Sequence, residues 1–182
     1  LHDALPICQE YVDFVSGVAV NCLGHSHPAI INAITTQSSK LMQSSNYYWN
    51  TPHKLLAKKL IDNCDHDKVF FCNSGTEAIE AALKIARKYG ALKTTKDKNV
   101  LMYMDESFHG RTMGSLSVTG QEKYQKDFRP LIGGTQKVKF NDVEELKKNF
   151  SDKVCAVIVE PIQGEGGINI ATIEFLKAAR DL

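Results

Sequence analysis

One segment constrains the fold more than any other: an apolar run, a short polar turn and a helical pattern that follow one another over residues 68–89. The run at 68–72 is short, β-branched and aromatic, which predicts a buried strand. Apolar residues then recur at helical spacing over 77–89. Ser74 and Glu77 have the spacing of a capping box, so the predicted helix begins at the turn.

The turn between this strand and helix is suited to an anion. A helix N-terminus presents unpaired backbone N–H groups and the positive end of the helix dipole. Gly75 lets a ligand approach the backbone closely, and the hydroxyls of Ser74 and Thr76 can donate further hydrogen bonds. The segment therefore predicts a phosphate-binding turn. Taken alone, it is also compatible with a capped turn that binds nothing.

Apolar strand-like runs alternate with helical patterns through the rest of the chain. Further strands are expected at residues 99–105, 137–140 and 154–160. Asp142 is the predicted cap of a helix at 143–150, and Thr172 is the predicted cap of the last helix. Near-continuous apolar strands separated by helices predict an α/β fold with a parallel sheet covered on both faces.

The chain is expected to divide near residue 65. Residues 8–65 predict a separate lobe with a short strand at 11–15 and helices at about 28–43 and 53–63. The loop between those helices is rich in aromatic residues, which more often mark an interface than solvent, and we expect a subunit contact at Tyr47–Asn50.

Residues 66–182 are expected to form the first part of a larger domain. The chain stops in or just after a helix, without the strand that would complete a βαβ unit, so we expect truncation on the C-terminal side. Residues 1–7 (LHDALPI) fit neither a signal peptide nor the run that follows, and we expect them to be a non-native scar.

Composition excludes several classes of partner. A net charge of +1 gives no electrostatic reason to expect nucleic acid or a membrane surface, and no apolar run approaches the ~18 residues of a membrane span. The five cysteines are odd in number and lack CxxC spacing, which favours a reducing compartment, the cytoplasm. Cys72 and Cys155 lie in apolar runs and are expected to behave as small hydrophobic residues. We expect no metal at His25 and His27, which precede a helix, or at residues 64–67.

Three predicted strand ends carry unusual polar content, and ligands of parallel sheets lie beyond such ends. The first is the Ser74–Thr76 turn, and the others are residues 107–112 and 160–167. Arg111 suits bidentate recognition of a carboxylate, and Phe108 suits stacking on a planar ring. Signatures of a P-loop, a dinucleotide fingerprint or a nucleophile elbow are absent from the sequence.

The third strand end adds two carboxylates, Glu160 and Glu165. Taken singly, these residues have ordinary alternatives: Arg111 could form a surface ion pair, Glu160 could pair with a lysine, and Glu165 could be solvated. Because the three strand ends are expected to meet at one edge of the sheet, their combination favours a binding site.

Several motifs together resemble one family. They are AVNCLGHSHP at 19–28, FFCNSGTEA at 70–78, AALKIARK at 81–88, SFHGRT at 107–112 and VEPIQGEGG at 159–167. From about Tyr11 to its last residue, the chain resembles the class III pyridoxal-phosphate aminotransferases. The resemblance implies fold type I, with an incomplete large domain and part of the small-domain segment.

The resemblance also implies roles for the residues singled out above. Ser74, Gly75 and Thr76 would bind the phosphate of pyridoxal 5′-phosphate, Phe108 would stack on its ring, and Glu160 would lie near it. Arg111 would hold the substrate carboxylate, and Glu165 would pair with an arginine later in the chain. The Tyr47–Asn50 loop would lie at the interface of a homodimer.

Within the family, the nearest resemblance is to enzymes that act on N-acetylornithine, which share the FFCNSG turn and the AVNxLGH segment. These enzymes transfer an amino group to 2-oxoglutarate in arginine biosynthesis. The enzymes of 4-aminobutyrate share FHGRT and come second, with ornithine and other ω-amino acids as further alternatives. From another class, a non-catalytic module that binds phosphorylated ligands or dimerises also remains open.

No residue of this chain is assigned the central catalytic role. Aminotransferase chemistry needs a lysine that forms a Schiff base with the cofactor aldehyde and an aspartate on the pyridine nitrogen. In the family both lie beyond the stretch that matches Glu160–Leu182. We therefore expect residues 1–182 alone to be inactive.

Overall fold

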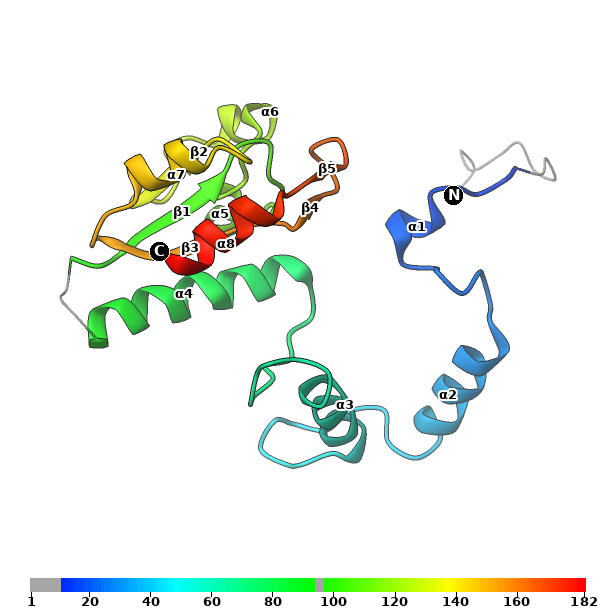
Figure 1. Cartoon of the computed structure of the whole chain (residues 1–182). Helices are drawn as coiled ribbons and strands as arrows, with labels where there is room; N and C mark the ends of the chain where they lie inside the picture. Colours follow the sequence, from blue (N-terminus) through cyan, green and yellow to red (C-terminus); the bar gives the residue numbers. More distant parts are fainter. Residues whose placement is uncertain (1–10, 94–96) are drawn as a thin grey trace. The chain divides into compact units, whose positions relative to one another are not determined.

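The computed structural model of the chain describes residues 11–93 and 97–182, so the expectation for residues 1–7 lies outside this part. The chain forms two compact units, one reaching to Val69 and the other spanning Phe70–Leu182 (Figure 1).

The first unit is helical in its described part. It contains α1 (Ser16–Ala19), α2 (Pro28–Ser38) and α3 (Thr51–Ile61). The strand expected at 11–15 is wrong, because the side chain of Asp13 folds this stretch into a turn. Its Oδ1 atom accepts the backbone N–H groups of Val15 and Ser16 at 2.9 and 2.8 Å, which is typical of a turn and incompatible with an extended strand.

The two longer helices begin where polar side chains cap them. His27 is the N-cap of α2 and accepts the Ala29 N–H at 3.2 Å, and Pro28 is the first residue of the helix. Asn50 caps α3 by accepting the N–H of His53 at 2.9 Å. Neither helix buries a side chain, and both end earlier than expected.

The second unit is built on a three-stranded sheet. Its strands are β1 (Val100–Met104), β2 (Thr135–Val138) and β3 (Val154–Ile158), in the order β2-β1-β3. All are parallel, with Met102 opposite Gln136 of β2 and Val157 of β3. The expected parallel sheet is therefore confirmed, although β2 begins two residues before the predicted strand and ends two before its end.

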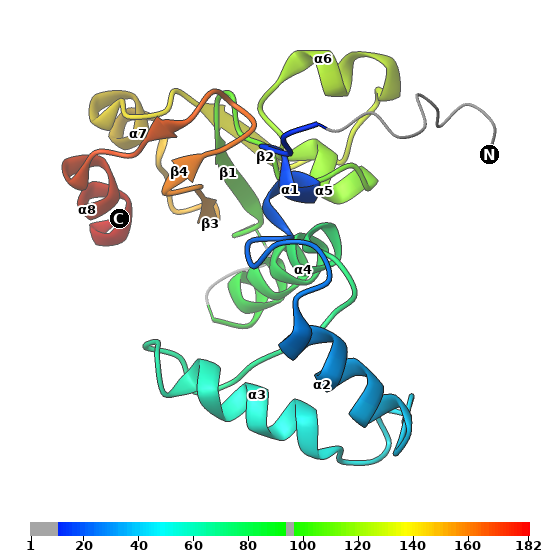
Figure 2. The same ribbon diagram turned by 90° about the vertical axis from the view of Figure 1, so that its right-hand side faces the viewer.

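Helices cover both faces of this sheet (Figure 2). On one face, Leu101 and Tyr103 of β1 pack with Leu83 of α4 (Gly75–Lys93) and with Val118, which follows α5 (Met113–Ser117). On the other, Met102 and Met104 pack with Leu146 of α7 (Val143–Asn149) and Phe175 of α8 (Ile173–Asp181). The central strand is thus buried on both sides, as near-continuous apolar strands predict.

The predicted caps of the last two helices are confirmed. Asp142 accepts the N–H of Glu145 at 2.9 Å, and Thr172 accepts the N–H of Phe175 at 3.1 Å. The remaining elements are α6 (Glu122–Gln125), the 3-10 helix Lys126–Phe128, and the antiparallel pair β4 (Ile162–Gln163) and β5 (Asn169–Ile170).

The strand expected at 68–72 is wrong. Residues 68–72 lie just before α4 and have no regular structure. The sheet consists of β2, β1 and β3, and none of these strands pairs with residues 68–72. An apolar run forms a strand only where a neighbouring strand supplies a ladder of hydrogen bonds. Cys72 is accordingly exposed, contrary to expectation, whereas Cys155 in β3 is half-buried.

Candidate functional site

The candidate site begins at the N-terminus of α4, where the sequence predicts a phosphate-binding turn. Ser74 Oγ accepts the N–H of Glu77 at 3.3 Å, as a capping residue does. The carboxylate of Glu77 accepts the N–H of Asn73 at 2.6 Å, one residue before the position of a standard capping box. The helix therefore starts where the sequence predicts, and at 19 residues it is the longest in the described part of the chain.

The turn is open and has unused donors. A Cβ atom placed on Gly75 would meet no heavy atom within 4 Å. The backbone N–H groups of Gly75 and Thr76 donate to no acceptor among residues 11–93 and 97–182. Free N–H groups at the positive end of a long helix fit a phosphate group.

The Thr76 side chain contacts residues 112–115, in the segment that follows β1. Its Oγ1 atom lies 3.0 Å from Thr112 Oγ1 and 2.7 Å from Ser115 Oγ. Gly110, with φ at +128°, lies against this hydroxyl, and a Cβ atom there would clash with it. Thr76 thus offers a ligand its backbone N–H, while its hydroxyl ties α4 to the segment that follows β1.

Glu80 strengthens the same tie and was not predicted as a site residue. One carboxylate oxygen accepts the backbone N–H groups of Gly114 at 2.9 Å and Ser115 at 3.1 Å, and it also accepts the hydroxyl of Thr112. Since these are the first N–H groups of α5, the carboxylate of α4 acts as the cap that α5 lacks in its own sequence. Thr76 and Glu80 are four residues apart and therefore share one helix face, but the sequence carries no signal for their contact with a segment more than 30 positions away.

The second and third strand ends are joined by a hydrogen bond. The backbone N–H of Phe108 donates to Glu160 Oε2 at 2.9 Å. Burial raises the pKa of Glu160, and hydrogen bonds from the N–H groups of Phe108 and Gly164 oppose that rise. The meeting of these two strand ends, expected from the sequence, is therefore present.

The substrate-binding candidates gather around Tyr124 of α6. The guanidinium carbon of Arg111 lies 4.8 Å from the centroid of the Tyr124 ring and 5.9 Å from that of Phe108. The two rings meet edge-to-face with centroids 5.5 Å apart. The hydroxyl of Tyr124 donates to Glu165 Oε1 at 2.6 Å. Sequence reasoning missed Tyr124, because its short helix has no local pattern that points to a site.

His109 lies inside the same loop and is buried. Its backbone N–H donates to Thr119 Oγ1 at 3.0 Å, while its side-chain Nε2 has no hydrogen-bond partner among the described residues. Burial lowers the pKa of the imidazole to about 4, so the ring is neutral at neutral pH. A neutral His109 leaves Arg111 as the positive charge of the 107–112 segment.

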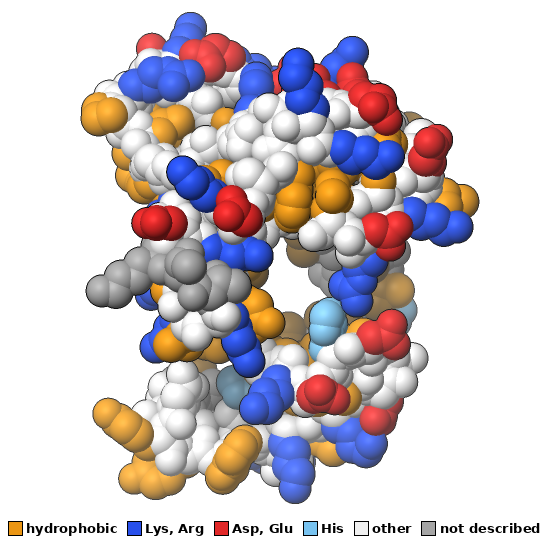
Figure 3. Space-filling model, turned by 60° about the vertical axis from the view of Figure 1, so that its left-hand side comes forward, with side chains coloured by type: hydrophobic (Ala, Val, Ile, Leu, Met, Phe, Trp, Pro, Cys, Tyr) orange, Lys and Arg blue, Asp and Glu red, His pale blue; other side chains and the backbone are white. Residues whose placement is uncertain are grey.

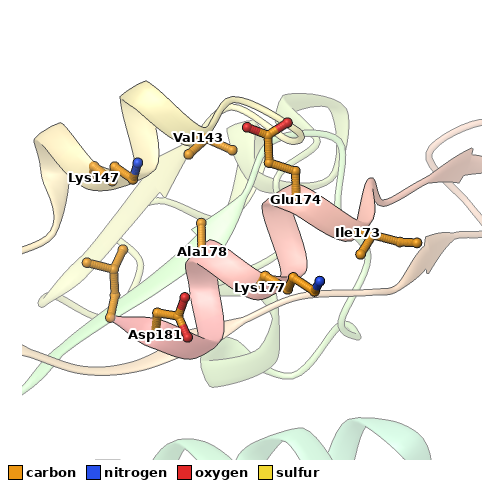
Figure 4. Close-up of a pocket in the computed structure, with 8 residues that line it drawn as sticks. Val143, Lys147, Ile173, Glu174, Lys177, Ala178 and Asp181 are labelled. Atoms are coloured by element: carbon orange, nitrogen blue, oxygen red, sulfur yellow. The ribbon is translucent and has the colours of Figure 1, made fainter.

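A separate hollow lies between α7 and α8 (Figure 4). Its lining mixes apolar side chains with two lysines and two carboxylates: Val143, Lys147, Ile173, Glu174, Lys177, Ala178, Asp181 and Leu182. Charges of both signs with no convergent hydrogen-bonding groups do not indicate a specific ligand. It shares no residue with the strand-end site, so we assign it no role.

None of the helices in the described part of the chain combines the length and apolar character needed to cross a bilayer.

The sequence matches the family model described as Aminotransferase class-III over residues 8–182. It is 63% identical over 173 residues to the acetylornithine aminotransferase of Clostridium acetobutylicum, covering 95% of this chain and 45% of that protein. The acetylornithine aminotransferase of Caldanaerobacter subterraneus subsp. tengcongensis is 50% identical over 172 residues, covering 94% and 44%. The chain therefore spans less than half the length of these curated relatives.

Solved structures agree with the sequence comparison. The crystal structure of the ornithine aminotransferase from Toxoplasma gondii ME49 matches with a TM-score of 0.87 at 32% identity, over 95% of this chain and 42% of that chain. This likeness confirms the expected α/β fold of pyridoxal-phosphate-dependent transaminases. With the family model matched from residue 8 to residue 182, the chain belongs to the class III aminotransferases.

Proposed function

We propose that the full-length protein transfers an amino group from N-acetylornithine to 2-oxoglutarate, a step of arginine biosynthesis. The observation that carries this proposal is the 63% identity to a relative of that name over nearly the whole chain. The geometry agrees with it, because a free anion-binding turn lies at the N-terminus of α4, and Thr76 of that turn contacts the segment after β1 that carries Arg111, an arginine with no ion-pair partner among the described residues.

Class III aminotransferases use pyridoxal 5′-phosphate. We propose that the Gly75 and Thr76 N–H groups and the Ser74 turn hold its phosphate, and that Phe108 contacts its ring. When bound, the cofactor supplies an electron sink that lets an amino group leave one carbon and join another. Glu160 would lie beside it and hold the Phe108 backbone in place through the 2.9 Å hydrogen bond.

Arg111 would bind the substrate carboxylate. Its guanidinium is exposed, packs against the Tyr124 ring and forms no ion pair with any described carboxylate. An arginine fork can bind a carboxylate in a bidentate manner, which fixes the end of the substrate that faces the cofactor. Glu165, held by the Tyr124 hydroxyl, would complete the substrate side of the site.

Residues 1–182 alone should be inactive, because the Schiff-base lysine would come from a later part of the full-length protein. The measurement is amino transfer by the purified 182-residue chain, compared with free pyridoxal phosphate. Turnover above that blank would contradict the proposal that the lysine lies outside this chain.

We further propose a cytoplasmic homodimer in which the Tyr47–Asn50 loop contributes to the interface. Tyr47 and Trp49 are 93% and 95% exposed, an unusual state for large aromatic side chains. Sedimentation of the full-length protein should give a dimer, and Trp49→Ser should shift it toward the monomer. A monomeric parent protein would contradict this part of the proposal.

The substrate is tested by comparing donors on the full-length protein with 2-oxoglutarate as acceptor. We expect kcat/KM to be highest for N-acetylornithine. The second candidate is an ornithine, 4-aminobutyrate or other ω-amino acid aminotransferase, favoured by the structural likeness to the ornithine enzyme. A higher kcat/KM with ornithine or 4-aminobutyrate would select that candidate. Binding of the cofactor without any amino transfer would instead favour the non-catalytic alternative.

A further inference from the structure

The loop that carries Phe108 and Arg111 is held through its backbone. The N–H of Phe108 donates to Glu160 Oε2 at 2.9 Å. The next residue, His109, donates its backbone N–H to Thr119 Oγ1 at 3.0 Å. These two N–H groups lie on either side of the Phe108 Cα atom, so their acceptors restrict the direction in which the Phe108 ring projects.

Thr119 has a second contact with the same loop. Its side chain is fully buried. Its Oγ1 atom lies 3.2 Å from the carbonyl oxygen of Gly110 and 3.0 Å from that of Ser115, and either oxygen can accept its hydrogen. The hydroxyl group therefore contacts both of the residues that separate Phe108 from Arg111.

We propose that Thr119 is a positioning residue whose hydroxyl group fixes the backbone of residues 109–110 and thereby orients Phe108 and Arg111 toward their ligands. The inference rests on the proposed function, in which Phe108 contacts the cofactor ring and Arg111 binds the substrate carboxylate. Thr119 acts through the loop, and it adds to the strand-end site a residue from the segment that follows α5.

Two substitutions separate the hydroxyl group from the space that the side chain fills. Thr119→Val keeps the shape but removes the hydroxyl, so the buried N–H of His109 loses its acceptor. Thr119→Ser keeps the hydroxyl and removes one methyl group. If the hydroxyl orients the loop, valine should weaken ligand binding and serine should not. If Thr119 only fills space, serine should be the more damaging change.

Ser117 supplies the matched control, because it is a second buried hydroxyl in the same segment. Its Oγ atom accepts the N–H of Ile132 at 3.0 Å and donates to the carbonyl oxygen of Met113. Both partners lie outside the 107–112 loop. Ser117→Ala should therefore lower the resistance to denaturant, as Thr119→Val does, without changing ligand binding.

The test uses the full-length protein with pyridoxal 5′-phosphate. Calorimetry with glutarate, a dicarboxylate without an amino or keto group, reports on Arg111. The visible circular dichroism of the bound cofactor reports on the surroundings of its ring, and so on Phe108. Thr119→Val should change this band and weaken glutarate binding about two- to tenfold, the factor that the net contribution of one hydrogen bond gives. Thr119→Ser and Ser117→Ala should match the parent in both measurements.

Three results would overturn the inference while glutarate binding by the parent stays intact. Thr119→Val could match the parent in both measurements. Ser117→Ala could show the same changes as Thr119→Val, which would indicate a general loss of stability. Thr119→Ser could be more damaging than Thr119→Val, which would assign Thr119 to packing. A parent protein that binds neither pyridoxal 5′-phosphate nor glutarate would instead contradict the proposed function.

Discussion

The two units of the chain use similar helices but differ in what those helices cover. In the first unit, α2 and α3 carry apolar residues at helical spacing, yet Ile34 and Leu55 are 64% and 63% exposed. In the second, Leu83 of α4 and Phe175 of α8 are buried against the sheet. Hydrophobic side chains that reach the surface are visible in the space-filling view (Figure 3).

This difference shows what an amphipathic pattern determines. An amphipathic pattern with a cap is sufficient to form a helix. The helix adds to the stability of the fold only when its apolar face packs against another surface. The candidate site lies in the unit that has such a surface, with its side chains at the ends of β1 and β3 and of α4. Precise positioning of a site is expected on such a scaffold.

The largest expected contrast comes from removing one leucine in each unit. Leu101→Ala leaves a cavity beneath α4 and should cost about 2–5 kcal/mol of the free energy of unfolding. Leu55→Ala in α3 should cost less than about 0.5 kcal/mol, because the side chain is exposed. Denaturant unfolding of the 182-residue chain measures both. Equal losses would contradict the difference between the units.

Acid should destabilise the second unit through His109. Its pKa is lowered to about 4 in the fold, below the 6.5 of an ordinary histidine. As the pH falls from 6.5 to 4, the unfolded chain binds a proton that the folded chain does not, so stability falls by roughly 2–3 kcal/mol and then levels off. The His109→Gln variant, followed by denaturant unfolding at each pH, should lose less stability over this range. An unchanged pH dependence in that variant would contradict the burial of a neutral ring.

The carboxylate of Glu80 should have an intermediate effect. Glu80→Ala leaves the first N–H groups of α5 without an acceptor and should cost about 1–3 kcal/mol. Glu80→Gln retains an acceptor oxygen and should cost less. Glu144→Ala, on the exposed surface of α7, is the control and should change stability by less than about 0.5 kcal/mol. If Glu80→Ala resembled this control, the contact between α4 and α5 would not stabilise the unit.

The smallest change in stability is expected at an exposed ion pair in the first unit, in which Lys58 Nζ lies 2.8 Å from Asp62 Oδ2. Asp62→Asn should change stability by less than about 0.5 kcal/mol, because solvent and salt screen such pairs. Denaturant unfolding at low and high salt checks this. A larger loss would mean that the first unit depends on surface charge rather than on a covering surface.

Features that depend on neighbours in the sequence were predictable. The caps at Asp142 and Thr172 were confirmed, because a cap is a contact between residues two or three positions apart. The parallel sheet was also predictable, since strands buried on both faces read as continuous apolar runs.

Features that depend on distant partners were not predictable. The apolar run at 68–72 has a strand composition but belongs to no ladder, and Asp13 folds 11–15 into a turn. The contacts of Tyr124 are with Arg111 and Glu165, which are 13 and 41 positions away in the sequence. Conversely, the pairing of Phe108 with Glu160 was expected in outline, because parallel strands bring their carboxyl ends to one edge.

We propose that the Ser74–Thr76 turn and Arg111 form the phosphate and carboxylate sites of one enzyme. A crystal structure of the full-length protein with pyridoxal 5′-phosphate and a bound dicarboxylate would test this. We expect the phosphate at the N–H groups of Gly75 and Thr76, the ring against Phe108 and the carboxylate on Arg111. A phosphate bound elsewhere, or an Arg111 paired with Glu165 instead of the ligand, would contradict it.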